Sequence, residues 1–210
     1  MIYEMRIYNF KPGGAVGQWE QNFLEAYQGT RDKYSKLGGM WHTEFGPLNQ
    51  AIHIWQYDSL QQRADIRAAA AKDPSGKWPP KGADLIVSQE VHILNPLKNS
   101  PVWTGEPQEL GGVWELRQYT YAPGNIGKVA TAFNDAIPAR QEIYPIGGIF
   151  TSDLGELNRL YQLFPYKDWN HRDEVRGVYQ KTHVWPPHAE VSPVHQLVRH
   201  MIPAKVSPLH

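Results

Sequence analysis

Apolar and polar positions follow two different periods along the first part of the chain. Residues 2–8 alternate apolar and polar side chains, which predicts a β-strand with two unlike faces. After a turn at Pro12, apolar residues between positions 16 and 37 recur at helical spacing. Gly38 and Gly39 follow, and glycine commonly ends a helix. The pattern therefore predicts a strand and then a helix that extends to the paired glycines.

The next segment predicts a hairpin, a second helix and a last strand. Residues 40–45 and 49–57 are typical of two strands joined by a turn at Gly46 and Pro47. Ser59 stands in the N-cap position before an alanine-rich helix, and residues 85–94 predict the last strand. The order strand, helix, strand, strand, helix, strand is that of a ferredoxin-like unit.

The same series of elements returns in the second part of the chain. The stretch YEMRIYNFKPGG from Tyr3 matches WELRQYTYAPGN from Trp114, an offset of 114 − 3 = 111 residues. Later matches include a second Trp-Pro-Pro motif, at Trp185 as at Trp78, an offset of 107 residues. A period near 110 residues exceeds the roughly 20–50 residues of solenoid repeats, so it indicates a duplicated domain. We predict a first domain at residues 1–97, a linker at 98–111 and a second domain at 112–210.

Each predicted unit would leave one face of its sheet bare. A four-stranded antiparallel sheet with both helices on one side exposes its other face, and two such sheets can cover each other. We therefore predict an α+β protein in which two tandem βαββαβ repeats form an intramolecular dimeric α/β-barrel. The space between the two sheets is then the expected pocket.

Composition narrows the classes of partner. The 21 Lys and Arg residues balance 21 Asp and Glu residues, so the net charge of zero favours neither nucleic acid nor an anionic membrane as a partner. The sequence has no cysteine, which excludes disulfides and thiolate chemistry and fits a reducing compartment. Without a basic leader or an apolar run of about 20 residues, we expect a cytoplasmic protein. Exposed strand edges favour a homo-oligomer.

Three stretches taken together resemble the NIPSNAP family: YEMRIYNFKPGG, FGPLNQAIHIWQYDSLQQRADIR and SQEVHIL. The resemblance covers essentially the whole chain and is stronger in the first half. It implies domains similar to dimeric α/β-barrel proteins, often with two copies in one chain. It implies a fold and carries over no catalytic residue.

The first strand supplies the first candidate site residues. If its apolar face, with Tyr3, Met5 and Ile7, lies against the helices, then Glu4, Arg6 and Tyr8 face the space between the sheets. A guanidinium there could grip a carboxylate or carbonyl oxygen of a ligand. The same Glu4 and Arg6 could instead form a buried ion pair that joins the two sheets, and the structural interpretation is the more favoured.

The hairpin strands supply the remaining candidates. His53 is a candidate general base, with Arg6 to stabilise an anion and Glu4 as a third catalytic candidate. The candidate ligand-binding residues are Tyr8, His42, Glu44, Asn49, Trp41 and Trp55.

A metal site is a weaker interpretation of the same residues. If the hairpin brings His42 opposite His53, Glu44 could complete a two-histidine, one-carboxylate set. The second half carries Thr151, Asp153 and Gln162 at the corresponding positions. Histidine on a mixed strand face more often has a structural role, so we predict no metal and no cofactor.

Two classes of function stay open at this level. The first is a NIPSNAP-type protein that binds a small apolar or aromatic molecule between its sheets or acts as an assembly module. The second is a cofactor-independent or metal-dependent enzyme, monooxygenase-like or isomerase-like, that acts on an aromatic or carbonyl substrate. The sequence favours the first class, and whether the protein is an enzyme stays open.

Overall fold

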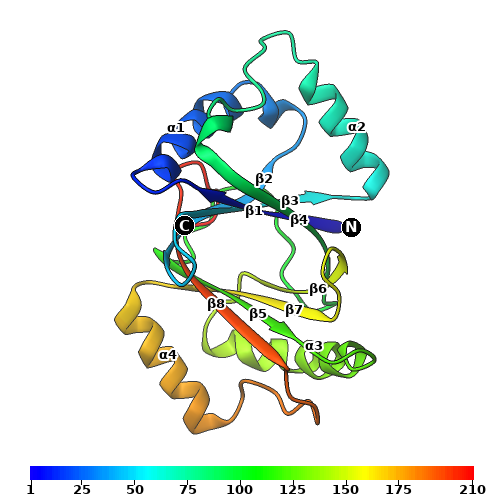
Figure 1. Cartoon of the computed structure of the whole chain (residues 1–210). Helices are drawn as coiled ribbons and strands as arrows, with labels where there is room; N and C mark the ends of the chain where they lie inside the picture. The colour runs from blue at the N-terminus through cyan, green and yellow to red at the C-terminus, as the bar shows by residue number, and fades with distance from the viewer.

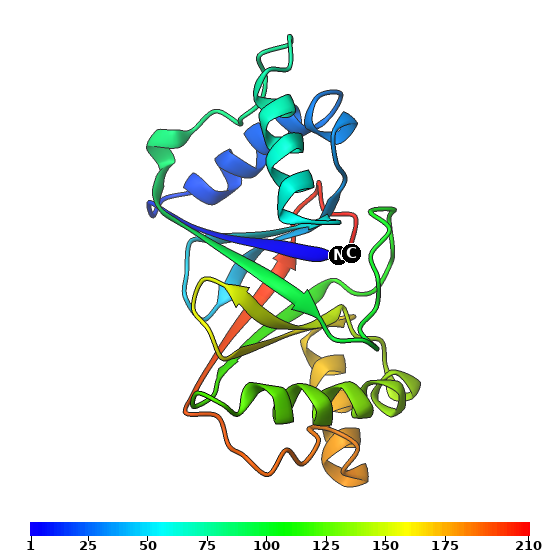
Figure 2. The same ribbon diagram turned by 90° about the vertical axis from the view of Figure 1, so that its right-hand side faces the viewer.

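The computed structural model describes residues 1–210 and contains one closed antiparallel barrel with four helices outside it (Figure 1). Helices α1 and α2 cover one side of the barrel, and α3 and α4 cover the opposite side. The view in Figure 2, turned by 90°, shows the same separation. The protein is therefore of the predicted α+β class.

Both halves have the predicted order of elements. The first half consists of β1 (Ile2–Phe10), α1 (Ala15–Tyr27), β2 (Leu37–Phe45), β3 (Gln50–Tyr57), α2 (Leu60–Ala71) and β4 (Ile86–Pro96), with short 3-10 turns at Arg31–Lys33 and Ala83–Leu85. The second half consists of β5 (Val113–Thr120), α3 (Ile126–Ile143), β6 (Gly148–Leu154), β7 (Arg159–Tyr166), α4 (Trp169–Thr182) and β8 (His195–Pro203).

Two seams between the halves close the barrel. The strand order is β1-β3-β2-β8-β5-β7-β6-β4, so each half keeps the ferredoxin-like arrangement of its own four strands. Strand β2 pairs with β8, with Trp41 opposite Pro203, and β4 pairs with β6, with Leu94 opposite Ser152. The prediction of an intramolecular barrel built from two repeats is confirmed.

The predicted faces of the first strand are reversed in the structure. Tyr3, Met5 and Ile7 are 0% exposed and lie in the core cluster of the barrel, together with Trp41 and Trp114. Their neighbours on β1 face the helices instead. Where β1 lines it, the barrel interior is filled by apolar side chains and takes the apolar face of the strand, whereas the layer under the helices opens to solvent at its edges and can hold charges. Side chains occupy the expected ligand space between the sheets.

The first helix is also shorter than predicted. Helix α1 ends at Tyr27, and Gly38 and Gly39 lie inside β2. A Cβ atom at Gly38 would come 2.6 Å from the ring of Trp103, and one at Gly39 would collide with Trp41. The paired glycines therefore make room for indole rings against the strand backbone and do not end a helix.

The predicted linker contributes to the barrel core. Trp103 is buried, meets the ring of Tyr3 edge-on at 5.1 Å and donates a hydrogen bond from Nε1 to the carbonyl oxygen of Gly147 at 2.6 Å. The N-cap prediction for Ser59 is confirmed, because its Oγ accepts a hydrogen bond from the backbone N–H of Gln62. None of the four helices combines the length and the apolar character that crossing a bilayer requires.

Candidate functional site

A cavity of about 300 Å³ lies in the first half between the outer face of the sheet and its covering helices. The sheet, the two helices, the first 3-10 turn and the Trp-Pro-Pro loop all contribute to its wall. Its lining consists of Arg6 and Tyr8 from β1; Trp19 and Phe23 from α1; Arg31 from the first 3-10 turn; His53, Trp55 and Tyr57 from β3; Arg67 from α2; Trp78, Pro79 and Pro80 from the loop; Ala83 from the second 3-10 turn; and Ile86 and Gln89 from β4.

Aromatic rings form much of this wall. The ring of Phe23 lies 5.5 Å from that of Trp78, and Trp55 lies 6.2 Å from Trp78, both edge-on. The ring of Trp19 lies 5.8 Å from the ring of His53. Such rings offer apolar faces and edges against which a flat molecule can pack.

His53 is the buried polar group of the cavity. Its side chain is 3% exposed, and its Nδ1 accepts a hydrogen bond from Nε1–H of Trp55 at 2.8 Å. Burial, together with the positive charges of Arg6, Arg67 and Arg31, holds the pKa of His53 well below its usual range. A neutral imidazole that accepts at Nδ1 carries its proton on Nε2. His53 is therefore a hydrogen-bond donor at Nε2, and this nitrogen has no partner in the protein.

Glu4 lies behind the cavity, paired with arginine. Its carboxylate is 0% exposed and accepts hydrogen bonds from Arg6 at 2.7 Å and from Arg63 at 2.6 Å. The guanidinium of Arg67 forms a longer ion pair with it at 3.9 Å. Burial alone would raise its pKa, but the hydrogen bonds and charges of Arg63 and Arg6 outweigh burial and lower it. Glu4 is thus a fixed anion that anchors guanidinium groups and is not free to transfer protons.

Arg31 is a buried cation without a carboxylate partner. It is 2% exposed, donates to the hydroxyl of Tyr57 at 3.0 Å and lies over the ring of Trp55 at 4.3 Å. No carboxylate oxygen lies within 4.0 Å of it, whereas surface and buried arginines elsewhere form such pairs. The cavity therefore has positive charge in excess.

Sequence reasoning missed Arg31, although the repeat contained the signal. An offset of 109 residues aligns Gly38 with Gly147 (147 − 38 = 109), and under it Arg31 falls on Arg140, Arg63 on Arg172 and Arg67 on Arg176. In each half three arginines lie within 4.0 Å of the buried glutamate, and the fourth, Arg31 or Arg140, has no carboxylate partner. The three are Arg6, Arg63 and Arg67 at Glu4, and Arg117, Arg172 and Arg176 at Glu115.

Some predicted site residues converge on the cavity. Arg6, Tyr8, His53 and Trp55 line it, and the Nε of Arg6 donates to the hydroxyl of Tyr8 at 2.7 Å. They meet beneath the helices and not between the sheets.

The other predicted residues lie elsewhere. Met40, not His42, is opposite His53, and His42 pairs with Glu20 of α1 at 3.0 Å. Glu44 is exposed, and Trp41 is inside the barrel. Asn49 has a φ of 55° in the hairpin turn, a left-handed conformation that asparagine tolerates. The expected meeting of His42, Glu44 and His53 does not occur, and no three His, Asp or Glu side chains are grouped as metal ligands.

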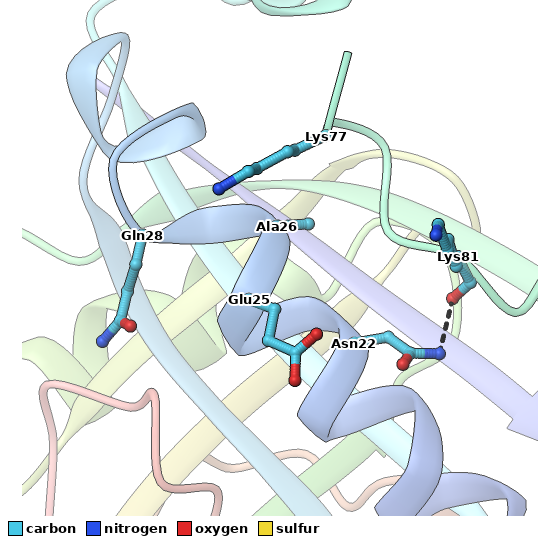
Figure 3. A pocket seen from close by; sticks show the side chains of 6 residues that line it. All are labelled: Asn22, Glu25, Ala26, Gln28, Lys77 and Lys81. Carbon is cyan, nitrogen blue, oxygen red and sulfur yellow. Dashed lines mark hydrogen bonds between the residues drawn. The ribbon is translucent and has the colours of Figure 1, made fainter. Parts of the chain in front are cut away.

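A larger hollow of about 440 Å³ lies between α1 and the loop that holds Lys77 and Lys81 (Figure 3). Ala26 is its only apolar lining residue, and Asn22 donates from Nδ2 to the carbonyl oxygen of Lys81 at 3.1 Å. Apart from Ala26, the side chains drawn there are polar, and those of Glu25, Gln28, Lys77 and Lys81 are exposed. This hollow lacks the buried, convergent groups of the cavity around His53.

The family model for NIPSNAP domains matches residues 3–101 and 114–208, which together cover most of the chain. The chain belongs to the NIPSNAP family. A NipSnap homolog from Dictyostelium discoideum is 31% identical over 186 residues, covering 88% of this chain and 78% of its own length. Human NipSnap homolog 3B is 31% identical over 224 residues, covering 99% and 85%.

A solved structure shares the fold of this NIPSNAP chain. The structure of a candidate monooxygenase from Lactobacillus acidophilus NCFM superposes with a TM-score of 0.64, covering 97% of this chain and 94% of its own. Its sequence is 12% identical, so the likeness shows a common architecture and no common activity.

The second NIPSNAP domain has a smaller pocket in the corresponding place. Its volume is about 120 Å³, and its lining consists of Arg117, Tyr119, Arg140, Gln162, Phe164, Tyr166, Arg176, Tyr179, Trp185 and Pro186. Counting from the N-caps Ser59 and Asp168, Tyr179 of α4 corresponds to Ala70 of α2. The larger side chain helps to explain why the second pocket is the smaller one.

Proposed function

We propose that the first NIPSNAP domain binds a small, flat and largely apolar molecule that carries a carbonyl or carboxylate oxygen. The observation that carries this proposal is the buried Nε2–H group of His53, which has no partner and belongs to a cavity lined by aromatic rings. A buried donor without a partner is costly, and a ligand oxygen would satisfy it.

The charges around the cavity support the same class of ligand. Arg6 and Arg31 line the cavity as guanidinium groups, and the neighbouring carboxylate of Glu4 is already paired. Arginine recognises carboxylate and carbonyl oxygens with parallel hydrogen bonds. The site thus combines a flat apolar surface with donors on one side, a pattern typical of sites for small organic acids and ketones.

A cofactor-independent enzyme is the second candidate, and the same donors favour it. A neutral imidazole N–H and a guanidinium together would stabilise an enolate or another oxyanion of a bound substrate. The Trp55 hydrogen bond occupies Nδ1 of His53, so His53 would act as a donor to the oxygen and not as the general base. The fold shared with the candidate monooxygenase is compatible with this function and gives it little further support.

The binding proposal is tested with 2-naphthoate and 2-acetylnaphthalene as probes, following the fluorescence of the cavity tryptophans and confirming by calorimetry. Ala70→Tyr copies Tyr179 of the second domain and should fill the first cavity, weakening binding at least about tenfold. His53→Ala should weaken it by about 1–3 kcal/mol, the range for losing a buried hydrogen bond.

Matched changes in the second domain are the controls. Tyr179→Ala and Gln162→Ala should leave probe affinity within about twofold, because they lie in the other pocket. Absence of binding of both probes at millimolar concentration, or unchanged affinity in Ala70→Tyr, would refute the proposal.

A further inference from the structure

The buried carboxylate of the second domain is fully engaged by arginine and histidine side chains. Glu115 is 0% exposed and pairs with Arg117 at 3.2 Å, with Arg172 and with Nε2 of His200 at 3.0 Å. Burial alone would raise its pKa, but the hydrogen bond of His200 and the charges of Arg117 and Arg172 lower the pKa of Glu115 to about 2. This carboxylate has no capacity left to balance another cation.

Arg140 is such a cation. Its side chain is 1% exposed, and its guanidinium lies over the rings of Tyr179 at 4.1 Å and Phe164 at 5.1 Å. It donates one hydrogen bond, to the carbonyl oxygen of Tyr144, and no carboxylate oxygen lies within 4.0 Å. Its Nε is buried without a partner. Arginine stays charged in proteins, so an unpaired charge this deep calls for an anion.

Two further buried donors line the same pocket without partners. Gln162 is 1% exposed and its Nε2 has no partner, and Tyr179 is 4% exposed with an unpartnered hydroxyl. Burial raises the pKa of Tyr179, which keeps that hydroxyl protonated. Arg117 and Arg176 add positive charge to the lining. The pocket is therefore rich in donors and poor in free acceptors.

Its size limits what it can hold. The volume of about 120 Å³ is less than half of the about 300 Å³ of the first-domain cavity. That space suits an anion of a few heavy atoms better than the flat ligand proposed for the first domain.

We propose that the second NIPSNAP domain is a binding site for a small oxyanion, either inorganic phosphate or sulfate or a carboxylate of acetate size, held by Arg140, Gln162 and Tyr179. Phosphate, sulfate and acetate share the chemistry that the pocket recognises, because each is a compact anion whose oxygen atoms accept hydrogen bonds. The inference is independent of the function proposed for the first domain, because it uses none of the same residues.

The test measures the melting temperature and the calorimetric affinity of the full chain with phosphate, sulfate or acetate, against chloride at equal ionic strength. Binding to the folded state raises the melting temperature in proportion to ln(1 + [L]/Kd). We expect at least one oxyanion to bind more than tenfold more tightly than chloride. Tyr179→Phe and Gln162→Met each remove one donor at nearly constant volume and should weaken that binding about five- to tenfold.

Changes in the first domain separate this site from the other. Tyr57→Phe and Ala70→Tyr should leave oxyanion affinity unchanged, whereas Tyr179→Phe and Gln162→Met should leave binding of 2-naphthoate unchanged. Arg140→Gln should abolish the oxyanion response, and if that variant does not fold, the two conservative variants decide. Equal effects of chloride and all three oxyanions, or oxyanion binding that survives both conservative changes, would overturn the proposal.

Discussion

A single strand position distinguishes the polar chemistry of the two domains. Across the β1–β3 pairing His53 stands opposite Arg6, and across the β5–β7 pairing Gln162 stands opposite Arg117. The sequence alignment of the repeats predicts this correspondence. It could not predict that His53 is a donor, because that depends on the Nε1–H of Trp55 and on burial, which only the packed structure fixes.

His53 should make the protein less stable in mild acid. Its pKa in the folded state is lowered, so below the unfolded value of about 6.5 the unfolded chain takes up a proton that the folded chain refuses. Stability then falls as pH falls, by up to about 1.4 kcal/mol per pH unit. His53→Gln should remove this loss, so urea unfolding at pH 7.5 and 5.5 should show a flatter profile in the variant.

His42 provides a control of opposite sign. The hydrogen bond that His42 donates to the carboxylate of Glu20 raises the pKa of His42, so its contribution to stability is present below about pH 6.5 and is lost as pH rises through the folded-state value. His42→Gln should therefore cost more stability at pH 5.5 than at pH 7.5.

The prediction for His53 would be contradicted by parallel pH profiles of the wild type and His53→Gln, because a neutral, buried His53 requires the two profiles to differ.

At the scale of elements, local signals predicted beginnings of helices better than ends. The side chain of Ser59 accepts a hydrogen bond from the first turn of α2, as its sequence position predicts, and Asp168 does the same at the start of α4. The end of α1 was predicted wrongly because Gly38 and Gly39 lie in β2, where each leaves room for an indole ring. The ring at Gly38 belongs to Trp103, 65 positions further along the sequence (103 − 38 = 65), a contact that no local pattern reveals.

Alanine substitutions at two glycines should have opposite effects on stability. At Gly38 a new Cβ would lie 2.6 Å from the ring of Trp103 and 3.0 Å from the carbonyl oxygen of Ile54, so Gly38→Ala should destabilise by about 1–3 kcal/mol. Gly17 lies inside α1 with nothing within 4 Å of its added Cβ. Gly17→Ala should stabilise by about 0.5–1 kcal/mol. Urea unfolding measures both, and equal signs would contradict the packing role of Gly38.

At the scale of the molecule, the repeat predicted the closed barrel but not which side of each sheet faces inward. The alternation of apolar and polar residues shows that a strand has two unlike faces, but it does not show which face points into the barrel. Here the apolar face of β1 fills the barrel, and the face with Glu4, Arg6 and Tyr8 meets aromatic side chains of the helices. A pocket therefore lies in each half and not between the halves. The homo-oligomer stays a prediction.

The barrel also predicts how the halves behave when separated. Fragments 1–97 and 111–210 would each expose one wall of the barrel core, including Trp41 and Trp114, whose rings lie 5.2 Å apart across the interior. Exposed apolar surface of this kind drives association. The separate fragments should therefore be poorly soluble or self-associated, and mixing them during refolding should give a one-to-one complex by native mass spectrometry.

Trp41→Ala should weaken that complex by on the order of 3–5 kcal/mol, the cost of deleting a buried indole, whereas Val87→Ala, at a position 66% exposed, should leave it unchanged. Two stable, monomeric fragments that never combine would contradict a core shared by both domains.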